Sequence, residues 1–389
     1  MKPIGLVTCY FHHNYGSMLQ AYATEMIMQD MGLPYETISC KAPINYMVEN
    51  KLLYFAKKIM IGDWKMKLGK FKIDQAKRDN PIFLKNWAIR DAAFNKFADE
   101  MFHVSPYCKN RSELETMATN YSAFLVGSDQ LWRTDSVEHG YYTLEWVPDG
   151  IRKIAYSTSI GVKEVPWFQV KKNRRFMNRF DYMALREQSA CDLVFKLTGR
   201  KVQVVLDPTL LFSGDQWMKI QNKEPLTNGK YIFCYFLGNN PNQRELVKKL
   251  KDKTAMKIVA LQHLDEYIPS DEGFADEAPY NVGPAEFLNY IRNAEYIFTD
   301  SFHCSVFSIL YKKKFFTFSR FSETAKQSTN TRIDNLLNIT GLSERRVNAG
   351  MSVDEILNLQ LDFNYADKKL DELRKSSIDY LKNALKGLE

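Results

Sequence analysis

The chain has 389 residues, of which 45% are hydrophobic and 25% are charged, with 25 Phe and 21 Tyr. This composition is typical of a globular protein, and the length exceeds that at which one hydrophobic core usually keeps growing, so we expect two domains. No apolar run is long enough to span a bilayer, and the opening MKPIGLVTCY predicts a strand rather than a signal peptide. We therefore expect a cytoplasmic protein.

The net charge of +7 is concentrated in one segment. Residues 51–90 contain eleven Lys and Arg against three Asp, so the remainder of the chain is close to neutral. This distribution argues against a nucleic-acid-binding protein, which is usually basic over a whole domain. The six cysteines lie far apart without a C-x-x-C pair, which argues against a zinc site or disulfide framework and predicts reduced, mostly buried thiols.

The first part of the chain predicts a parallel α/β sheet. A strand at Ile4–Tyr10 is followed by the loop FHHNYG, a helix that ends at Gly32, and a strand at Tyr35–Ser39. Further strands are expected at Ser122–Val126, Lys153–Ser157, Tyr182–Leu185 and Val202–Leu206, with a helix at Gln188–Leu197. Loops at the carboxyl ends of such strands commonly bind ligands.

Residues 44–101 interrupt this pattern with helical sequence rich in Lys and aromatic residues. We interpret this segment as a basic helical insertion in the first domain. Two interpretations of its charge stay open: contact with an anionic membrane or a polyanionic acceptor, or simply a solvated helix face. The first would place the protein at the inner face of the membrane.

The second part of the chain repeats the α/β pattern. We expect domains at residues 1–212 and 213–365, with a connector at Gly214–Gly229 and a final helix within residues 366–389 that packs back on the first domain. The acidic loop Asp265–Glu277 is expected to be exposed and mobile. Expected strands lie at Tyr231–Leu237, Lys257–Leu261, Tyr296–Thr299 and Phe315–Phe318, and expected helices at Gln243–Lys251, Glu286–Arg292, Arg332–Ile339 and Asp367–Leu388.

The stretch Ala294–Tyr311, AEYIFTDSFHCSVFSILY, combines a buried strand, a tight turn and an apolar helix. Asp300 or Ser301 can cap that helix, and His303 falls in its first turn. A helix start carries unpaired N–H groups and partial positive charge, which suit a phosphate or carboxylate. An ordinary capped helix with a buried histidine is the alternative.

Four stretches together resemble the polysaccharide pyruvyltransferase family: NYGSMLQAYA at Asn14–Ala23, GSDQLW at Gly127–Trp132, DPTLL at Asp207–Leu211, and TDSFH at Thr299–His303. The resemblance implies two Rossmann-like domains facing across a cleft, as in GT-B glycosyltransferases. It also implies transfer of the carboxyethylidene group of phosphoenolpyruvate to two sugar hydroxyls in the biosynthesis of capsule or other surface polysaccharide. Phosphoenolpyruvate would be a substrate, the acceptor a glycan or lipid-linked saccharide, and no cofactor is expected.

The resemblance also implies site residues. Arg186 and His303 would be catalytic and would bind the donor, with Ser301 and Arg332 as further donor-binding residues, because arginine binds oxyanions bidentately. The acceptor would be bound by residues of the two strand-end loops in the first domain: Asn14, Gly16, Asp129 and Gln130.

The chain departs from part of the family at two positions. Ser301 stands where some members have arginine, which removes one phosphate ligand, and Cys304 stands where many have glycine. Adjacent helical residues point about 100° apart, so Cys304 and His303 are not expected to form a catalytic pair. G-x-G-x-x-G and P-loop patterns are absent from the sequence, and no metal site is expected. A GT-B glycosyltransferase that uses a nucleotide sugar, and a non-catalytic carbohydrate-binding relative, stay open as alternatives.

Overall fold

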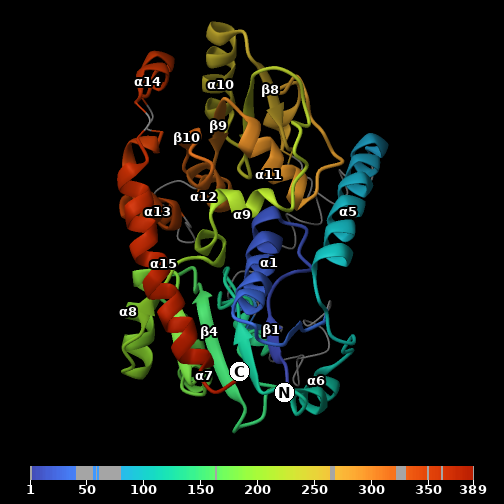
Figure 1. Ribbon diagram of the computed structural model, residues 1–389, viewed down its shortest axis with the longest axis vertical. Helices are drawn as coiled ribbons and strands as arrows, with labels where there is room; N and C mark the ends of the chain where they lie inside the picture. The colour runs from blue at the N-terminus through green and yellow to red at the C-terminus, as the bar shows by residue number, and fades with distance from the viewer. Residues whose placement is uncertain are drawn as a thin grey trace. The chain divides into compact units, whose positions relative to one another are not determined.

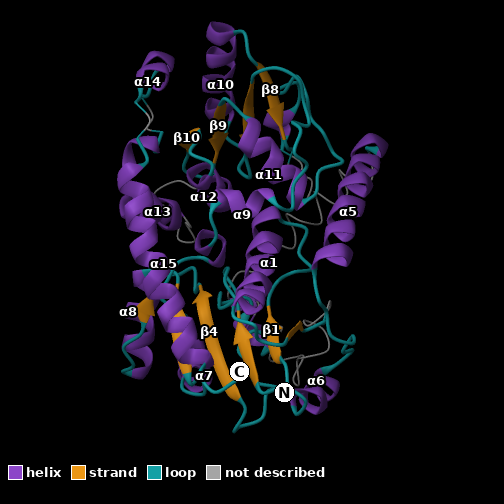
Figure 2. Cartoon of the chain, in the orientation of Figure 1, coloured by secondary structure: helices purple, strands orange, loops and turns teal. Residues whose placement is uncertain are grey.

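The computed structural model describes residues 2–40, 56–57, 59–60, 80–162, 164–262, 268–320, 330–347, 350–360 and 362–388 (Figure 1). The chain forms two compact units. Unit 1 comprises Met1–Gly69, Ala98–Leu211 and Leu373–Glu389, and unit 2 comprises Lys70–Phe97 and Phe212–Glu372. Each unit is built around its own parallel sheet (Figure 2), so the predicted α/β class is confirmed.

Unit 1 contains a six-stranded sheet in the order β2-β1-β3-β4-β5-β6. All of its strand pairs are parallel, so the carboxyl ends of the strands share one edge of the sheet. The strands are β1 (Ile4–Val7), β2 (Tyr35–Thr37), β3 (Ala123–Val126), β4 (Arg152–Thr158), β5 (Tyr182–Leu185) and β6 (Gln203–Val204).

The helices of unit 1 follow or precede these strands in the chain. They are α1 (Tyr15–Asp30), α6 (Arg111–Ala118), α7 (Val170–Met177), α8 (Gln188–Thr198) and the carboxyl-terminal part of α15 (Asn364–Leu385). Gly199, at φ 74°, ends α8 in the left-handed conformation that glycine adopts without steric cost. From Leu373 onward, α15 belongs to unit 1: Ser377 Oγ accepts from the Leu206 N–H at 3.0 Å, and Tyr380 donates to the Ala155 carbonyl at 3.0 Å.

Unit 2 contains a four-stranded parallel sheet in the order β10-β9-β7-β8. Its strands are β7 (Tyr231–Tyr235), β8 (Lys257–Ala260), β9 (Tyr296–Thr299) and β10 (Lys314–Thr317). Its helices are α9 (Gly214–Met218), α10 (Pro241–Thr254), α11 (Pro284–Asn293), α12 (Phe302–Leu310), α13 (Asn330–Thr340) and α14 (Val353–Asn358). Aromatic rings fill its core: Phe298 stacks on Phe316 across neighbouring strands, with ring centroids 5.3 Å apart.

All six cysteines are buried, so the prediction of mostly buried thiols is confirmed. None of the helices among the described residues combines the length and apolar character needed to cross a bilayer.

The structure differs from the sequence prediction in several regions. The expected connector at Gly214–Gly229 begins with a capped helix, α9. The loop Asp265–Glu277 was expected to be exposed, but Phe274 is buried and Asp271 accepts two hydrogen bonds from the buried Arg244, at 2.8 and 2.6 Å. Residues 263–267 lie outside the described residues.

Most of the basic segment at residues 44–80 also lies outside the described residues. The helix that follows it is α5 (Pro81–Met101). The sequence analysis placed residues 44–101 in the first domain. In the structure, α5 up to Phe97 belongs to unit 2 instead. Within unit 2, the buried Arg90 of α5 donates to the Gln262 carbonyl at 2.6 Å.

Candidate functional site

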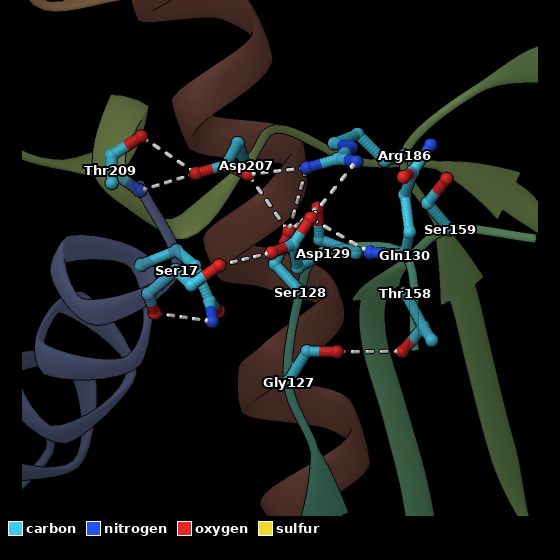
Figure 3. A network of polar contacts seen from close by, with 12 residues as sticks. Ser17, Gly127, Ser128, Asp129, Gln130, Thr158, Ser159, Arg186, Asp207 and Thr209 are labelled. Atoms are coloured by element: carbon cyan, nitrogen blue, oxygen red, sulfur yellow. Dashed lines mark hydrogen bonds and ion pairs between the residues drawn. The ribbon is translucent and has the colours of Figure 1, made fainter. Parts of the chain in front are cut away.

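The loop after β1 leads into α1, and the first turn of α1 contacts the loop after β3. Asn14 is the N-cap of α1, and its side chain accepts from the Ser17 N–H at 3.2 Å. Gly16 lies in the first turn of the helix and is buried. Ser17 Oγ donates to Asp129 Oδ2 at 2.7 Å, so the capped helix start holds a carboxylate of the next loop (Figure 3).

The loop after β3, Gly127-Ser128-Asp129-Gln130, has a constrained backbone. A side chain at Gly127 would lie 2.9 Å from Thr8 Cγ2, and the Gly127 carbonyl accepts from Thr158 Oγ1 at 2.9 Å. Asp129 adopts φ 82°, which non-glycine residues rarely do, and its Oδ1 accepts from the Gln130 N–H at 2.8 Å. The loop therefore presents the Asp129 side chain in a defined direction.

Arg186 follows β5 directly and lies at the centre of the polar network in Figure 3. Its Nη1 donates to Asp207 Oδ2 at 3.1 Å and approaches Ser128 Oγ at 3.4 Å. Ser128 Oγ also donates to Asp207 Oδ2 at 2.8 Å, and Thr209 Oγ1 donates to Asp207 Oδ1 at 2.6 Å. The fully buried Asp207 carboxylate thus fixes one side of the guanidinium.

Two further carboxylates lie near the other nitrogens of Arg186. Glu187 Oε2 is 3.8 Å from Nε and Asp129 Oδ1 is 4.0 Å from Nη2. Burial alone would lower the pKa of Arg186, but the negative charges of Asp207, Glu187 and Asp129 outweigh it and raise that pKa above its ordinary value. Arg186 is therefore positively charged, and the carboxylates of Asp207, Glu187 and Asp129 around it outnumber its single positive charge.

Sequence reasoning missed several members of this network. Asp207, Ser128 and Ser17 were recognised within their motifs but were given no site role, and Glu187 was noted beside Arg186 without being assigned to the site. Burial, and then the charge of Asp129, raise the pKa of the Cys9 thiol, which therefore stays neutral 3.7 Å from Asp129 Oδ2. Ser128, Glu187 and Asp207 each come two or three residues after a parallel strand, which was the available signal, because such positions share one edge of the sheet.

In unit 2 the equivalent position follows β9. Of the two caps that the sequence left open, Asp300 and Ser301, the structure shows Ser301 as the N-cap of α12: its hydroxyl accepts from the Cys304 N–H at 3.5 Å. His303 lies in the first turn and is 7% exposed. The His303 ring packs edge-to-face on Phe302. The Arg332 guanidinium lies over the same Phe302 ring, 5.7 Å from its centroid. Ser301, His303 and Arg332 therefore belong to one neighbourhood.

The residue before this cap has a structural role. Asp300 is buried, and its two carboxylate oxygens accept from the N–H groups of Leu237 and Gly238 at 2.7 and 2.8 Å. Arg320, which sequence reasoning did not single out, donates from Nη2 to the Asp300 carbonyl at 3.1 Å. Asp300 thus connects the loops after β7 and β9, so the capping role falls to Ser301.

Cys304 is completely buried, and burial raises the pKa of its thiol to about 12. The prediction that it is a small buried residue is confirmed. Among the described residues, no group of three His, Cys, Asp or Glu side chains is arranged to hold a metal ion.

The predicted site residues thus form two clusters. Asn14, Gly16, Asp129, Gln130 and Arg186 surround the strand ends of unit 1, and Ser301, His303 and Arg332 surround the start of α12 in unit 2. That they bind one donor and one acceptor stays a prediction.

Comparison with solved structures supports the fold. A UDP-GlcNAc 2-epimerase from Methanocaldococcus jannaschii matches 97% of this chain and 99% of its own, with a TM-score of 0.53 and 11% identity. S. aureus MnaA with UDP matches 99% of this chain and 97% of its own, with a TM-score of 0.53 and 10% identity. At these identities the similarity concerns the fold alone. It confirms the predicted GT-B-like class of two Rossmann-like units; the cleft stays a prediction.

A search of curated proteins finds no match. A family model described as polysaccharide pyruvyl transferase matches residues 14–322, which include all four motifs and both clusters except Arg332. This match extends over well more than half of the chain and confirms the resemblance seen in the sequence. The chain therefore belongs to the polysaccharide pyruvyl transferase family.

Proposed function

We propose that this protein transfers the carboxyethylidene group of phosphoenolpyruvate to two hydroxyls of a saccharide, forming a pyruvate ketal in surface-polysaccharide biosynthesis. The family match supports a transferase of this kind. In the balanced reaction, two acceptor oxygens bond to C2 of the donor and the bond from C2 to the phosphate oxygen breaks. One hydroxyl proton ends on the methylene carbon, and the other leaves with the phosphate.

The observation that carries the proposal is the fixed guanidinium of Arg186. The donor has a carboxylate and a phosphate, and arginine binds either through two parallel N–H groups. Asp207 and Ser128 engage Nη1 and hold the guanidinium in place, and we assign the donor to this guanidinium. Because the side chain is only 5% exposed, a bond to it would be weakly screened by water.

The start of α12 is assigned to the donor as well. N–H groups at a helix start favour an anion, and Ser301 adds a hydroxyl there. His303 would supply the proton for the methylene carbon, since an imidazole can exchange protons near neutral pH. Arg332 would replace the arginine that some relatives have at the position of Ser301.

The acceptor is assigned to Asp129 and Gln130. A carboxylate held by Ser17 and by the Gln130 N–H can accept a hydrogen bond from a sugar hydroxyl and favours its attack on C2. Asn14 and Gly16 would act through the shape of the loop that holds Ser17. The acceptor would be a glycan or a lipid-linked saccharide, presented in the cytoplasm.

The proposal is tested by incubating candidate glycans and lipid-linked saccharides with enzyme and phosphoenolpyruvate. We expect release of phosphate together with a glycan product that has gained a carboxyethylidene group by mass spectrometry. A panel of UDP-sugars serves as the competing donor. Glycosyl transfer from a UDP-sugar, with no ketal from phosphoenolpyruvate, would contradict the proposal.

Arg186→Lys tests the donor assignment, because lysine retains the charge but lacks the planar fork. We expect weaker binding of phosphoenolpyruvate than in the wild type. Arg179→Lys is the matched control, since Arg179 binds Asp149 and backbone carbonyls elsewhere in unit 1. Wild-type donor affinity in Arg186→Lys would place Arg186 outside the donor site.

A further inference from the structure

Three consecutive hydroxyl residues, Ser157, Thr158 and Ser159, lie at the carboxyl end of β4 and are completely buried. The strand is irregular there, because its pairing with β5 shifts between Tyr156 and Thr158 and Ser157 adopts φ 56°. Asp129, at the end of the neighbouring strand β3, adopts φ 82°. Two non-glycine residues in the left-handed region thus lie on adjacent strand ends, which requires surrounding contacts that impose both conformations.

The end of β4 supplies such contacts to the backbone of the loop after β3. Thr158 Oγ1 donates to the Gly127 carbonyl at 2.9 Å, as Figure 3 shows, and Thr158 forms a parallel bridge with Asp129. The Ser159 N–H donates to the Asp129 carbonyl at 2.9 Å. The peptide groups on both sides of Ser128 are therefore held by the end of β4.

The middle residue of that loop is held through its side chain. Ser157 Oγ lies 3.3 Å from Ser128 Oγ. A hydroxyl has one proton to donate, and Ser128 donates its own to the Asp207 carboxylate, so Ser157 is the donor in this contact. Each residue of Gly127–Asp129 is thus bound by one residue of Ser157–Ser159.

The same segment also contacts the end of β5. Ser159 Oγ donates to Glu187 Oε1 at 2.7 Å, and Glu187 is the residue that follows Arg186. The end of β4 therefore binds the loop that presents Asp129 on one side and the Arg186-Glu187 pair on the other. These contacts fix the separation of the two functional groups, with Asp129 Oδ1 4.0 Å from Arg186 Nη2.

We propose that Thr158 is a positioning residue of the transfer reaction: its bond to the Gly127 carbonyl keeps Asp129 where an acceptor hydroxyl can reach a donor bound at Arg186. The inference rests on the proposed function and adds to it a residue that contacts neither substrate. Without the Thr158 hydroxyl, Ser17 still binds the Asp129 carboxylate and Asp207 still binds Arg186. Each substrate should therefore still bind, whereas their alignment should be lost.

The test is steady-state kinetics of the full-length protein with phosphoenolpyruvate and the saccharide that the wild type converts, together with calorimetric titration of phosphoenolpyruvate. Thr158→Val keeps the shape of the side chain and removes the hydroxyl, and Thr158→Ser keeps the hydroxyl. We expect Thr158→Val to lower kcat roughly 10–100-fold, with less than about threefold change in donor dissociation constant and acceptor KM. Thr158→Ser should retain most of the wild-type kcat.

Thr340→Val is the matched control, because Thr340 is equally buried and donates to the Leu336 carbonyl at 2.7 Å at the end of α13. It should leave kcat unchanged, and urea unfolding verifies that each variant assayed is folded. If Thr158→Val does not fold, Ser157→Ala replaces it, since it removes the bond to Ser128 and should give the same loss of kcat at retained affinity.

Three results would overturn the role of Thr158: wild-type kcat in the folded Thr158→Val variant (or in Ser157→Ala where that replaces it), an equal loss in Thr158→Ser or Thr340→Val, or a loss confined to donor affinity. Absence of ketal formation by the wild type instead overturns the proposed function, and this inference with it.

Discussion

The buried carboxylate of Glu25 should make the stability of unit 1 depend on pH. Glu25 lies on α1, is fully buried, and accepts from the Thr37 hydroxyl and from the His103 N–H at 3.2 Å. Burial raises the pKa of Glu25 from 4.5 to about 7, although the bonds from Thr37 and His103 act in the opposite direction. The folded protein therefore holds this proton more tightly than the unfolded chain does.

The sign and size of the effect follow from linkage. With the pKa raised on folding, the contribution of Glu25 is most favourable below pH 4.5 and is lost as the pH rises through about 7. At about 1.4 kcal/mol per pKa unit, this shift corresponds to a loss of roughly 3 kcal/mol. Glu25→Gln cannot ionise and can still accept from Thr37, so it should be spared that loss.

The assay is urea unfolding of wild type and Glu25→Gln from pH 5 to pH 8. We expect the unfolding free energy of the variant to rise relative to that of the wild type by about 2.5 kcal/mol across this range. Glu115→Gln, which alters an exposed partner of Arg111, should show no such trend. Parallel stability curves for wild type and Glu25→Gln would refute the argument.

Three further predictions concern the site and the basic segment. His303→Gln should lower turnover roughly 10²–10⁴-fold with less effect on donor affinity, whereas near-normal kinetics in both His303→Gln and His303→Ala would leave His303 as a structural residue. Asp207→Ala should destabilise the protein by about 3–5 kcal/mol in urea unfolding, because it leaves buried Arg186 without its closest partner, and an unchanged midpoint would contradict this. Residues 51–90, with a charge balance of +8, should bind anionic liposomes in sedimentation less strongly as salt rises; equal binding to neutral vesicles would exclude the electrostatic mechanism.

Much of the fold could be predicted from sequence because the buried strands are short apolar runs. Tyr182–Leu185 and Tyr296–Thr299 were predicted with their observed bounds, since each is apolar and ends at a charged or polar residue. The strand expected at Val202–Leu206 is only Gln203–Val204, since it lies at the edge of the sheet and pairs on one side. Buried Phe274 packs against Phe236 and lies under the guanidinium of Arg244, and both of these residues lie far away in sequence.

The candidate site could be predicted only in part, for the same reason. Asn14, Ser301 and Asp129 stand beside recognisable turns and helix starts, so local sequence indicates them. The pairing of Arg186 with Asp207 depends on the order of strands in the sheet, which no local pattern contains. Local sequence therefore does not indicate that carboxylates surround Arg186.

The positive φ of Asp129 has a consequence for how the family can diverge. At φ 82° the position tolerates Gly, Asn and Asp far better than other residues, and of these Asp alone supplies a carboxylate. The codons of Asn and Gly each differ from those of Asp by one nucleotide. A single base change at this position can therefore remove the carboxylate while the loop keeps its shape. If Asp129 engages the acceptor as proposed, such a change would give a folded relative that binds a saccharide without transferring a group to it.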